Sequence, residues 1–173
     1  NGTTNYILSS MEKKNKSFTE ILNKAKKLGF AETNPISDIN GSDSASKLRI
    51  LSSIAFNKSI SKNKILTEGI QNINLTDILH AKSLGYKIKL LSISEVKKNK
   101  LMERVHPCLI LKSSYIAKID GVLNAVVVDG LPILRSIPRV QSNQIVTSSG
   151  LWASMEASLT SSSPPSSSGR RRS

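Results

Sequence analysis

Apolar residues recur at helical spacing over residues 17–29, and both ends of this segment carry helix boundary signals. Ser17 and Glu20 form a capping box, in which each side chain can accept a hydrogen bond from the other residue's backbone N–H. One face then carries Ile21, Leu22, Ala25 and Leu28. Gly29 provides a C-terminal stop. The pattern predicts an amphipathic helix over 17–29.

Further helices are expected on both sides of a turn-rich loop at 30–42, where Pro35 disfavours helix. A helix over 43–56 would have an apolar face containing Ala45, Leu48, Leu51 and Ala55. Another is expected over 75–84, between a cap at Asn74 and a stop at Gly85. Residues 6–11 favour a short helix after a turn at residues 1–3.

Three segments have the pattern of strands: 87–93, 108–112 and the valine-rich 122–129. Helices mixed with strands predict an α/β (α+β) domain, in which a sheet is flanked by helices.

Composition changes near Gly130. All 18 lysines lie at or before Lys118, whereas residues 131–173 contain no lysine, five arginines and 13 serines. A serine- and proline-rich end cannot bury enough apolar surface to fold. We therefore expect a folded domain over 1–130 and a divergent, largely disordered tail over 131–173.

The formal net charge of +13 would suit nucleic acid, but aromatic residues make up only 4% of the chain, so bases would find few stacking partners. No apolar run is long enough for a membrane span, and no signal peptide is visible. A single cysteine, Cys108, excludes an internal disulfide. These features predict a cytoplasmic protein without membrane or nucleic-acid partners. Since the first residue is not Met, we expect the chain to begin inside a longer protein.

Candidate chemistry is concentrated in residues 30–47, which contain Glu32, Asp38, Asp43 and Lys47. Asp43 and Lys47 are four positions apart, so on a helix they share a face and can pair. The ordinary explanation is a surface ion pair worth under about 1 kcal/mol. Alternatively, the carboxylates hold the ammonium of an amino acid and tune a lysine that exchanges protons with a substrate alcohol.

A long spaced motif helps to distinguish these explanations. Residues 25–47 follow the pattern Ala-x-x-x-Gly-aromatic-Ala-Glu-x-x-Pro-x-x-Asp-x-x-Gly-x-Asp-x-x-x-Lys. Five other segments, 1–8, 68–70, 84–91, 105–107 and 120–126, occur in the same order as in one known family. Over residues 1–130 the chain resembles the catalytic domain of that family, the homoserine dehydrogenases.

The resemblance implies a mixed sheet flanked by helices and a set of site residues. Lys47 and Asp43 would be catalytic, with Lys47 as acid/base or proton relay and Asp43 orienting it. Glu32 and Asp38 would bind the substrate, chiefly its ammonium. Gly2, Thr3 and Phe30 would line the substrate pocket.

The family interconverts L-homoserine and L-aspartate 4-semialdehyde with NADP or NAD, in the biosynthesis of threonine, methionine and isoleucine. The cofactor would be bound mainly by a missing N-terminal domain, because no G-x-G-x-x-G follows a predicted strand here. The fragment alone is therefore expected to be inactive. The parent would be a homodimer, and we expect no metal site in this chain. The alternative is a non-catalytic basic helical module that contacts nucleic acid or an acidic partner.

Overall fold

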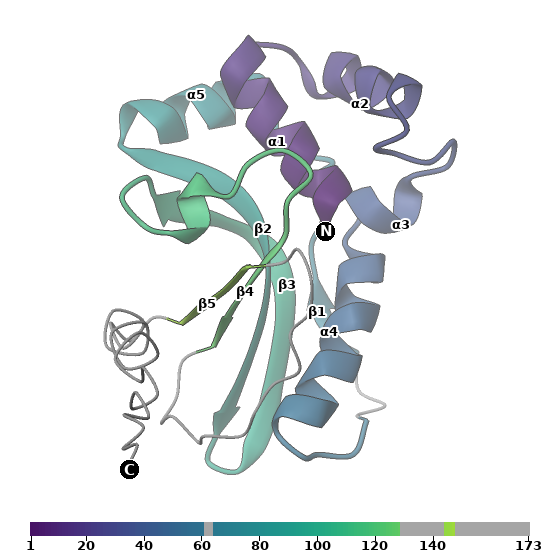
Figure 1. Ribbon diagram of the computed structural model, residues 1–173, viewed down its shortest axis with the longest axis vertical. Coiled ribbons are helices and arrows are strands. Elements are labelled where there is room, and N and C mark those ends of the chain that lie inside the picture. The colour runs from purple at the N-terminus through teal and green to yellow at the C-terminus, as the bar shows by residue number, and fades with distance from the viewer. Residues whose placement is uncertain (61–63, 129–143, 148–173) are drawn as a thin grey trace, which may run out of the picture. The chain divides into compact units, whose positions relative to one another are not determined.

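The computed structural model describes residues 1–60, 64–128 and 144–147, the last by backbone only. The chain divides into two compact units, Asn1–Asn124 and Ala125–Ser173, and each is considered by itself (Figure 1). Of the predicted tail over 131–173, only a strand at Gln144–Thr147 falls within the described residues.

The first unit is a small mixed sheet with helices packed against it, as the sequence predicted. Its elements in chain order are α1 Gly2–Lys14, α2 Phe18–Lys27, α3 Ile36–Ile39, α4 Ser42–Ala55, β1 Leu66–Thr67, α5 Leu75–Ser83, β2 Tyr86–Lys97, β3 Lys100–Leu111 and the 3-10 helix η1 Ile116–Lys118. The sheet order is β1-β3-β2. β3 pairs with β1 in parallel and with β2 antiparallel.

A tight hairpin joins β2 to β3. Lys98 and Asn99 both have positive φ, 47° and 61°, which is the backbone geometry that matches the twist of two antiparallel strands. The register runs from Tyr86 opposite Leu111 to Lys97 opposite Lys100. The second unit contains β4 Ala125–Val128 paired in parallel with β5 Gln144–Thr147.

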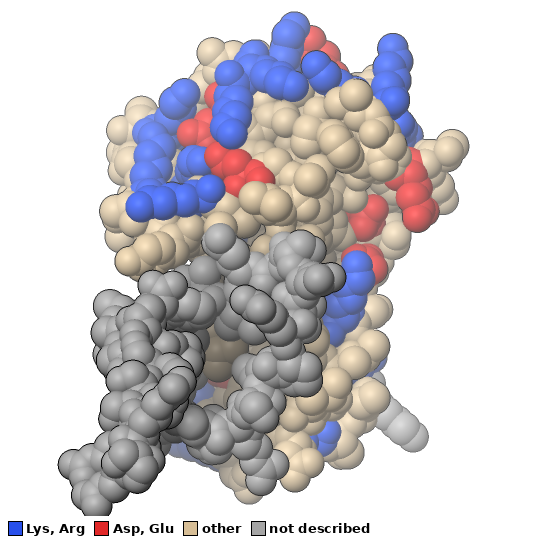
Figure 2. Space-filling model, in the orientation of Figure 1, with Lys and Arg blue, Asp and Glu red and all other residues tan. Residues whose placement is uncertain are grey.

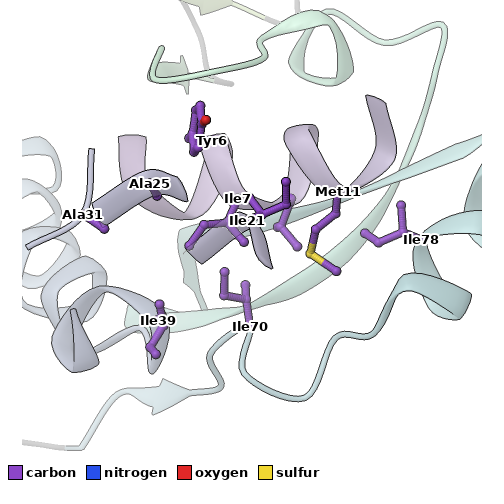
Figure 3. Close-up of a cluster of buried hydrophobic side chains, with 10 residues drawn as sticks. Tyr6, Ile7, Met11, Ile21, Ala25, Ala31, Ile39, Ile70 and Ile78 are labelled. Atoms are coloured by element: carbon purple, nitrogen blue, oxygen red, sulfur yellow. The ribbon is translucent and has the colours of Figure 1, made fainter. Parts of the chain in front are cut away.

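The core of the first unit lies where α1 contacts α2, α3, α5 and β2 (Figure 3). Ile7 and Met11 of α1 are fully buried there, and Ile70 from the segment before α5 is equally buried. Each contributes roughly 1.5–3 kcal/mol of burial free energy. A second cluster, Leu48, Ile65 and Val105, lies where α4 packs against β3.

Several helix predictions are confirmed. The predicted capping box of Ser17 with Glu20 starts α2, and Asn74 caps α5 as expected, in a second capping box formed with Asp77. The first helix is longer than expected, because the predicted turn at residues 1–3 is its first turn. Asn1 is the N-cap, and its side chain accepts a hydrogen bond from the backbone N–H of Thr4.

The predicted apolar face of α4 was wrong in part. Leu51 is 56% exposed and Ala55 is also exposed, whereas the buried positions are Ser44, Leu48 and Ser52. Because two of the three buried positions are serines, the pattern of apolar residues does not identify the buried face of α4. Their burial is tolerated where the hydroxyl is satisfied, and Ser52 Oγ donates to the Leu48 carbonyl at 2.8 Å.

The strand boundaries also differ from the prediction. β3 begins at Lys100 rather than at residue 108, and its charged first half is stabilised across the sheet by Arg104, which donates to Glu95 at 2.6 Å. β4 begins at Ala125 rather than at residue 122, since residues 121–122 form a turn in which Gly121 has φ 69°.

An ion-pair cluster fixes Asp120 after η1. Lys87 donates to both carboxylate oxygens of Asp120 at 3.1 and 2.9 Å, Lys89 donates at 2.9 Å, and Lys13 lies 3.2 Å away. Glu12 is 3.9 Å from Lys87. Burial raises the pKa of Asp120, but the hydrogen bonds from Lys87 and Lys89 outweigh that effect and lower it to about 2, from an ordinary 3.8.

The lowered pKa of Asp120 predicts an acid-sensitive part of the stability. Because the folded-state pKa lies below the unfolded one, the contribution is complete above about pH 4 and is lost as the pH falls toward 2. The urea midpoint of the chain should exceed that of Asp120→Asn at pH 6, and this difference should shrink between pH 4 and pH 2. A difference that stays constant over this range would contradict the assignment.

Candidate functional site

The predicted acids Asp38 and Asp43 lie on either side of a tight junction between α3 and α4. Gly41 makes this junction possible with φ 84°, a left-handed conformation that a residue with a Cβ adopts at a cost. Its N–H donates to the Asp38 carbonyl at 3.2 Å. Thr67 Cγ2 would lie 3.1 Å from a Cβ at Gly41, so the junction is also close-packed against β1. The one-turn helix α3 lies inside what we predicted to be a loop.

Asn1 joins the two acids. Its side-chain amide donates to Asp38 Oδ1 at 2.6 Å and to Asp43 Oδ2 at 3.0 Å. Its amide oxygen caps α1 through the N–H of Thr4. Both protons of one neutral amide therefore hold two carboxylates that would otherwise repel each other.

Lys47 completes a four-residue cluster. Its ammonium lies 2.8 Å from Asp43 Oδ2, one helical turn further along α4. The Lys47 side chain is 66% exposed and that of Asp43 28%. The pair has the i,i+4 spacing predicted, and its ammonium faces solvent on one side and the carboxylate on the other.

Gly2, Thr3 and Phe30 come together at the start of α1. Thr3 Oγ1 donates to the Phe30 carbonyl at 2.9 Å, and the Phe30 ring stacks at a tilt on Tyr6, with ring centroids 4.9 Å apart. Phe30 remains 39% exposed. A Cβ at Gly2 would lie 2.8 Å from the Val122 carbonyl oxygen, closer than real Cβ contacts, so only glycine fits there.

Glu32 is not drawn into this arrangement. It is exposed, and within residues 1–60 and 64–128 it makes no hydrogen bond or ion pair. The structure thus connects Asp38, Asp43 and Lys47 through Asn1, connects Thr3 with Phe30, and leaves Glu32 facing solvent.

Asn1 is the functional candidate that the sequence analysis missed. An Asn directly before a helical segment is a typical N-cap, so placing the helix start at Gly2 would have identified its capping role. Its contacts with Asp38 and Asp43 span 37 and 42 positions, and no local pattern predicts them.

A shallow depression of about 240 Å³ lies along another side of α4. It is lined by Ser42, Ser46 and Arg49 of the helix and by Lys64, Ile65 and Thr67 opposite, and Asp43 and Lys47 do not contribute to it. Within the described part of the chain, no group of three His, Cys, Asp or Glu side chains is placed to hold a metal ion. Nor does any helix there combine the length and hydropathy needed to cross a bilayer.

The residues present do not fit a dinucleotide-binding site. The described sheet contains a hairpin and a two-residue edge strand, and no strand leads through a G-x-G-x-x-G turn into a helix.

The distribution of positive charge does not identify a binding partner. Figure 2 shows Lys and Arg side chains interspersed with Asp and Glu, and Lys13, Lys16 and Lys87 are each paired with an acid.

The fold and the cluster of Asn1, Asp38, Asp43 and Lys47 define an α/β domain in which two carboxylates in the first turns of α3 and α4 lie close to a lysine one turn further along α4. Comparison with known proteins identifies the family. The family model for homoserine dehydrogenase matches residues 1–151, which extends past the boundary at 130 expected from composition. The chain belongs to the homoserine dehydrogenase family.

Individual relatives agree. The chain is 44% identical over 130 residues to the homoserine dehydrogenase of Pseudomonas aeruginosa, covering 75% of this chain and 30% of that protein. The Helicobacter pylori enzyme is 46% identical over 130 residues, with 75% and 31% covered. The crystal structure of S. aureus homoserine dehydrogenase at pH 7.5 matches with a TM-score of 0.68 and 43% identity, over 70% of this chain and 30% of that one. The chain thus spans about a third of these relatives' length, and nothing in the comparisons supports the alternative of a nucleic-acid-binding or acidic-partner module.

Proposed function

We propose that this chain forms the substrate domain of a homoserine dehydrogenase, an NAD(P)-dependent oxidoreductase that interconverts L-homoserine and L-aspartate 4-semialdehyde. The observation that carries the proposal is the hydrogen-bonded series Lys47–Asp43–Asn1–Asp38 at the meeting point of α1, α3 and α4. It combines one cation with two carboxylates, which are the charges needed to act on an amino-acid alcohol.

Lys47 is the proposed proton relay. When hydride reaches the aldehyde carbon of aspartate semialdehyde, the oxygen becomes an alkoxide that needs a proton and a nearby positive charge. An ammonium can supply both, and Asp43 at 2.8 Å holds it in place. In the reverse direction the neutral amine form of Lys47 accepts the proton of the homoserine hydroxyl.

Asp38 and Glu32 are the proposed partners of the substrate's ammonium. Asp38 is half-buried, and among the described residues its carboxylate accepts one hydrogen bond, from Asn1, so its second oxygen can accept another. Glu32 is exposed and can turn toward a ligand without breaking an existing bond. Gly2, Thr3 and Phe30 would line the pocket from the start of α1, where Gly2 allows the backbone to lie close to Val122.

The nicotinamide cofactor, NADP or NAD, would supply the hydride and would be held mainly by a domain other than this one, because the residues described here do not fit it. Closure of that domain over Lys47 would remove water from an ammonium that is 66% exposed in this unit. The whole enzyme would be a cytoplasmic homodimer acting in the biosynthesis of threonine, methionine and isoleucine. A folded domain over 1–130 and a divergent tail over 131–173 remain part of this proposal.

Asp38→Asn tests the ammonium-binding role in a chimera whose aligned 130 residues replace their counterparts in the Pseudomonas aeruginosa enzyme. Removing the charge should lower kcat/KM for L-homoserine about 10- to 100-fold, equivalent to about 1.5–3 kcal/mol for a charged hydrogen bond. Turnover of 4-hydroxybutanoate, which lacks the amine, should change less than about threefold because the lost interaction does not exist there. NAD(P)H absorbance follows both reactions.

Asp77→Asn is the matched control, since this acid caps α5 and touches no proposed site residue. It should leave the preference for homoserine over 4-hydroxybutanoate unchanged. Equal losses of both substrates in Asp38→Asn would argue against the assignment, as would a chimera that folds and oxidises neither alcohol.

A further inference from the structure

A buried lysine lies outside the site just described. Lys89, on β2, is 6% exposed, and its ammonium donates to Asn5 Oδ1 at 2.8 Å, to the Ile119 carbonyl at 2.5 Å and to Asp120 Oδ1 at 2.9 Å. Its three protons therefore have three acceptors, one on α1 and two in the segment after η1. Burial lowers the pKa of Lys89, and Asp120 opposes that shift.

A buried charge is an inefficient way to gain stability alone. Desolvation offsets most of the attraction between Lys89 and Asp120, and an apolar side chain of similar volume often serves as well. What an apolar residue cannot do is fix three acceptors in one geometry.

Lys89 and three residues of α1 hold the segment 119–123 against one face of that helix. Asn5 Nδ2 donates to the carbonyls of Ile119 and Leu123 at 3.1 and 3.0 Å. Ser9 Oγ accepts from the Gly121 N–H at 3.1 Å. Gly2 packs directly under the Val122 carbonyl oxygen. Residues 2, 5 and 9 follow helical spacing, so this face of α1 is given over to the segment.

The start of the same helix carries the site. Asn1 caps α1 and donates to both Asp38 and Asp43, and Thr3 donates to the Phe30 carbonyl. Gly2, between them, lies against Val122 of the same segment, since a Cβ there would be 2.8 Å from the Val122 carbonyl oxygen. A shift of α1 of a few tenths of an ångström would lengthen the Asn1 bonds to both acids.

We propose that Lys89 is a positioning residue for the substrate site, which it serves by clamping segment 119–123 onto α1 and thereby fixing Asn1 and Gly2 beside Asp38 and Asp43. This rests on the proposed function. Lys89 touches neither substrate nor reacting atoms in this role. It acts through Asn5, Ile119 and Asp120 on the geometry of the first turn.

Lys89→Met in the chimera tests the proposal. The KM for L-homoserine should rise about tenfold or more, while the KM for NAD(P) stays within twofold, because the cofactor is held by another domain. Amide hydrogen exchange should quicken in residues 1–9 and 119–123. Lys87→Met is the matched control: Lys87 also binds Asp120 but makes no bond to Asn5 or Ile119. It should leave the homoserine KM within twofold.

The control variant also separates positioning from stability. Lys87→Met removes both hydrogen bonds that Lys87 makes to Asp120, so it should lower the thermal midpoint as Lys89→Met does. Only Lys89→Met should raise the homoserine KM, because only Lys89 also binds Asn5 and Ile119. If Lys89→Met is insoluble, Asn5→Ala removes the same link from the helix side and should raise the homoserine KM alike.

Two results would overturn the inference: an unchanged homoserine KM in Lys89→Met, or an equal rise of that KM in Lys87→Met. Failure of the proposed function would look different. Asp38→Asn would then lose both alcohols equally, whatever Lys89 does.

Discussion

Lys47→Ala should lower kcat for homoserine oxidation by about 10²- to 10⁴-fold in the chimera, the range that a positioned acid or base contributes to proton transfer. The loss should fall on kcat more than on the homoserine KM, because the alkoxide that Lys47 stabilises exists only near the transition state. Stopped-flow or steady-state NAD(P)H absorbance with saturating cofactor measures both constants.

The same substitution should hardly change stability. The Lys47–Asp43 pair is an exposed i,i+4 ion pair on α4, worth under about 1 kcal/mol. Alanine is also the best helix former, which offsets part of the lost pair. Urea unfolding should therefore separate a chemical defect from a folding defect.

Lys26→Ala is the control for loss of a lysine, since Lys26 is an exposed residue of α2 whose side chain makes no ion pair within the described part of the chain. It should leave kcat within twofold. Asp43→Asn should cost less than Lys47→Ala, because an amide can still accept a hydrogen bond from the ammonium but no longer attracts it as a charge. If Lys47→Ala keeps more than a tenth of wild-type kcat, another group carries the proton and the assigned roles are wrong.

Local sequence patterns were sufficient to predict the ends of helices that are determined by residues a few positions apart. The capping boxes at Ser17 and Asn74 fixed the starts of α2 and α5, because both partners lie three positions apart. The apolar alternation of β2 likewise gave its central part. These features depend on neighbours along the chain, which the sequence displays directly.

The sequence did not predict which polar residues are buried, because burial of a polar side chain depends on its hydrogen-bond partners in the folded chain. The buried stripe of α4 uses Ser44 and Ser52, and the hydrogen bond from Ser52 to Leu48 removes the usual penalty for a buried hydroxyl. Lys89 has the appearance of a solvent-facing strand residue, yet acceptors 84, 30 and 31 positions away allow its burial.

The candidate site shows both cases together. Asp43 and Lys47 pair within one helical turn, and spacing alone predicted this. The approach of Asp38 to Asp43 depends on Asn1, whose position is set by the packing of α1 against α2, α3 and α5. A resemblance to a family could supply the list of residues, but the Asn1 amide joins Asp38 and Asp43 only in the folded chain, across 37 and 42 positions.

The backbone that carries Asp38 should be the part of this domain least tolerant of added volume, and Gly69→Ala should show it. A Cβ at Gly69 would overlap the Ile39 carbonyl oxygen and Asn40 Cα, and would lie 2.7 Å from the Asn40 carbonyl carbon. All three are backbone atoms, so no side chain can move aside. The Ile70 N–H donates to the same Ile39 carbonyl at 2.8 Å and fixes the approach.

We expect Gly69→Ala to lower the free energy of unfolding by about 3 kcal/mol or more, the upper part of the range for overpacking, and to displace residues 38–43. Gly85→Ala is the control, because Gly85 has φ 84° but nothing within 4 Å of its Cβ position, leaving only the left-handed strain of roughly 1–2 kcal/mol. Urea unfolding gives both values. A Gly69→Ala variant no less stable than Gly85→Ala would mean that the α3–α4 junction yields easily, and a junction that yields could not hold Asp38 and Asp43 on a single amide.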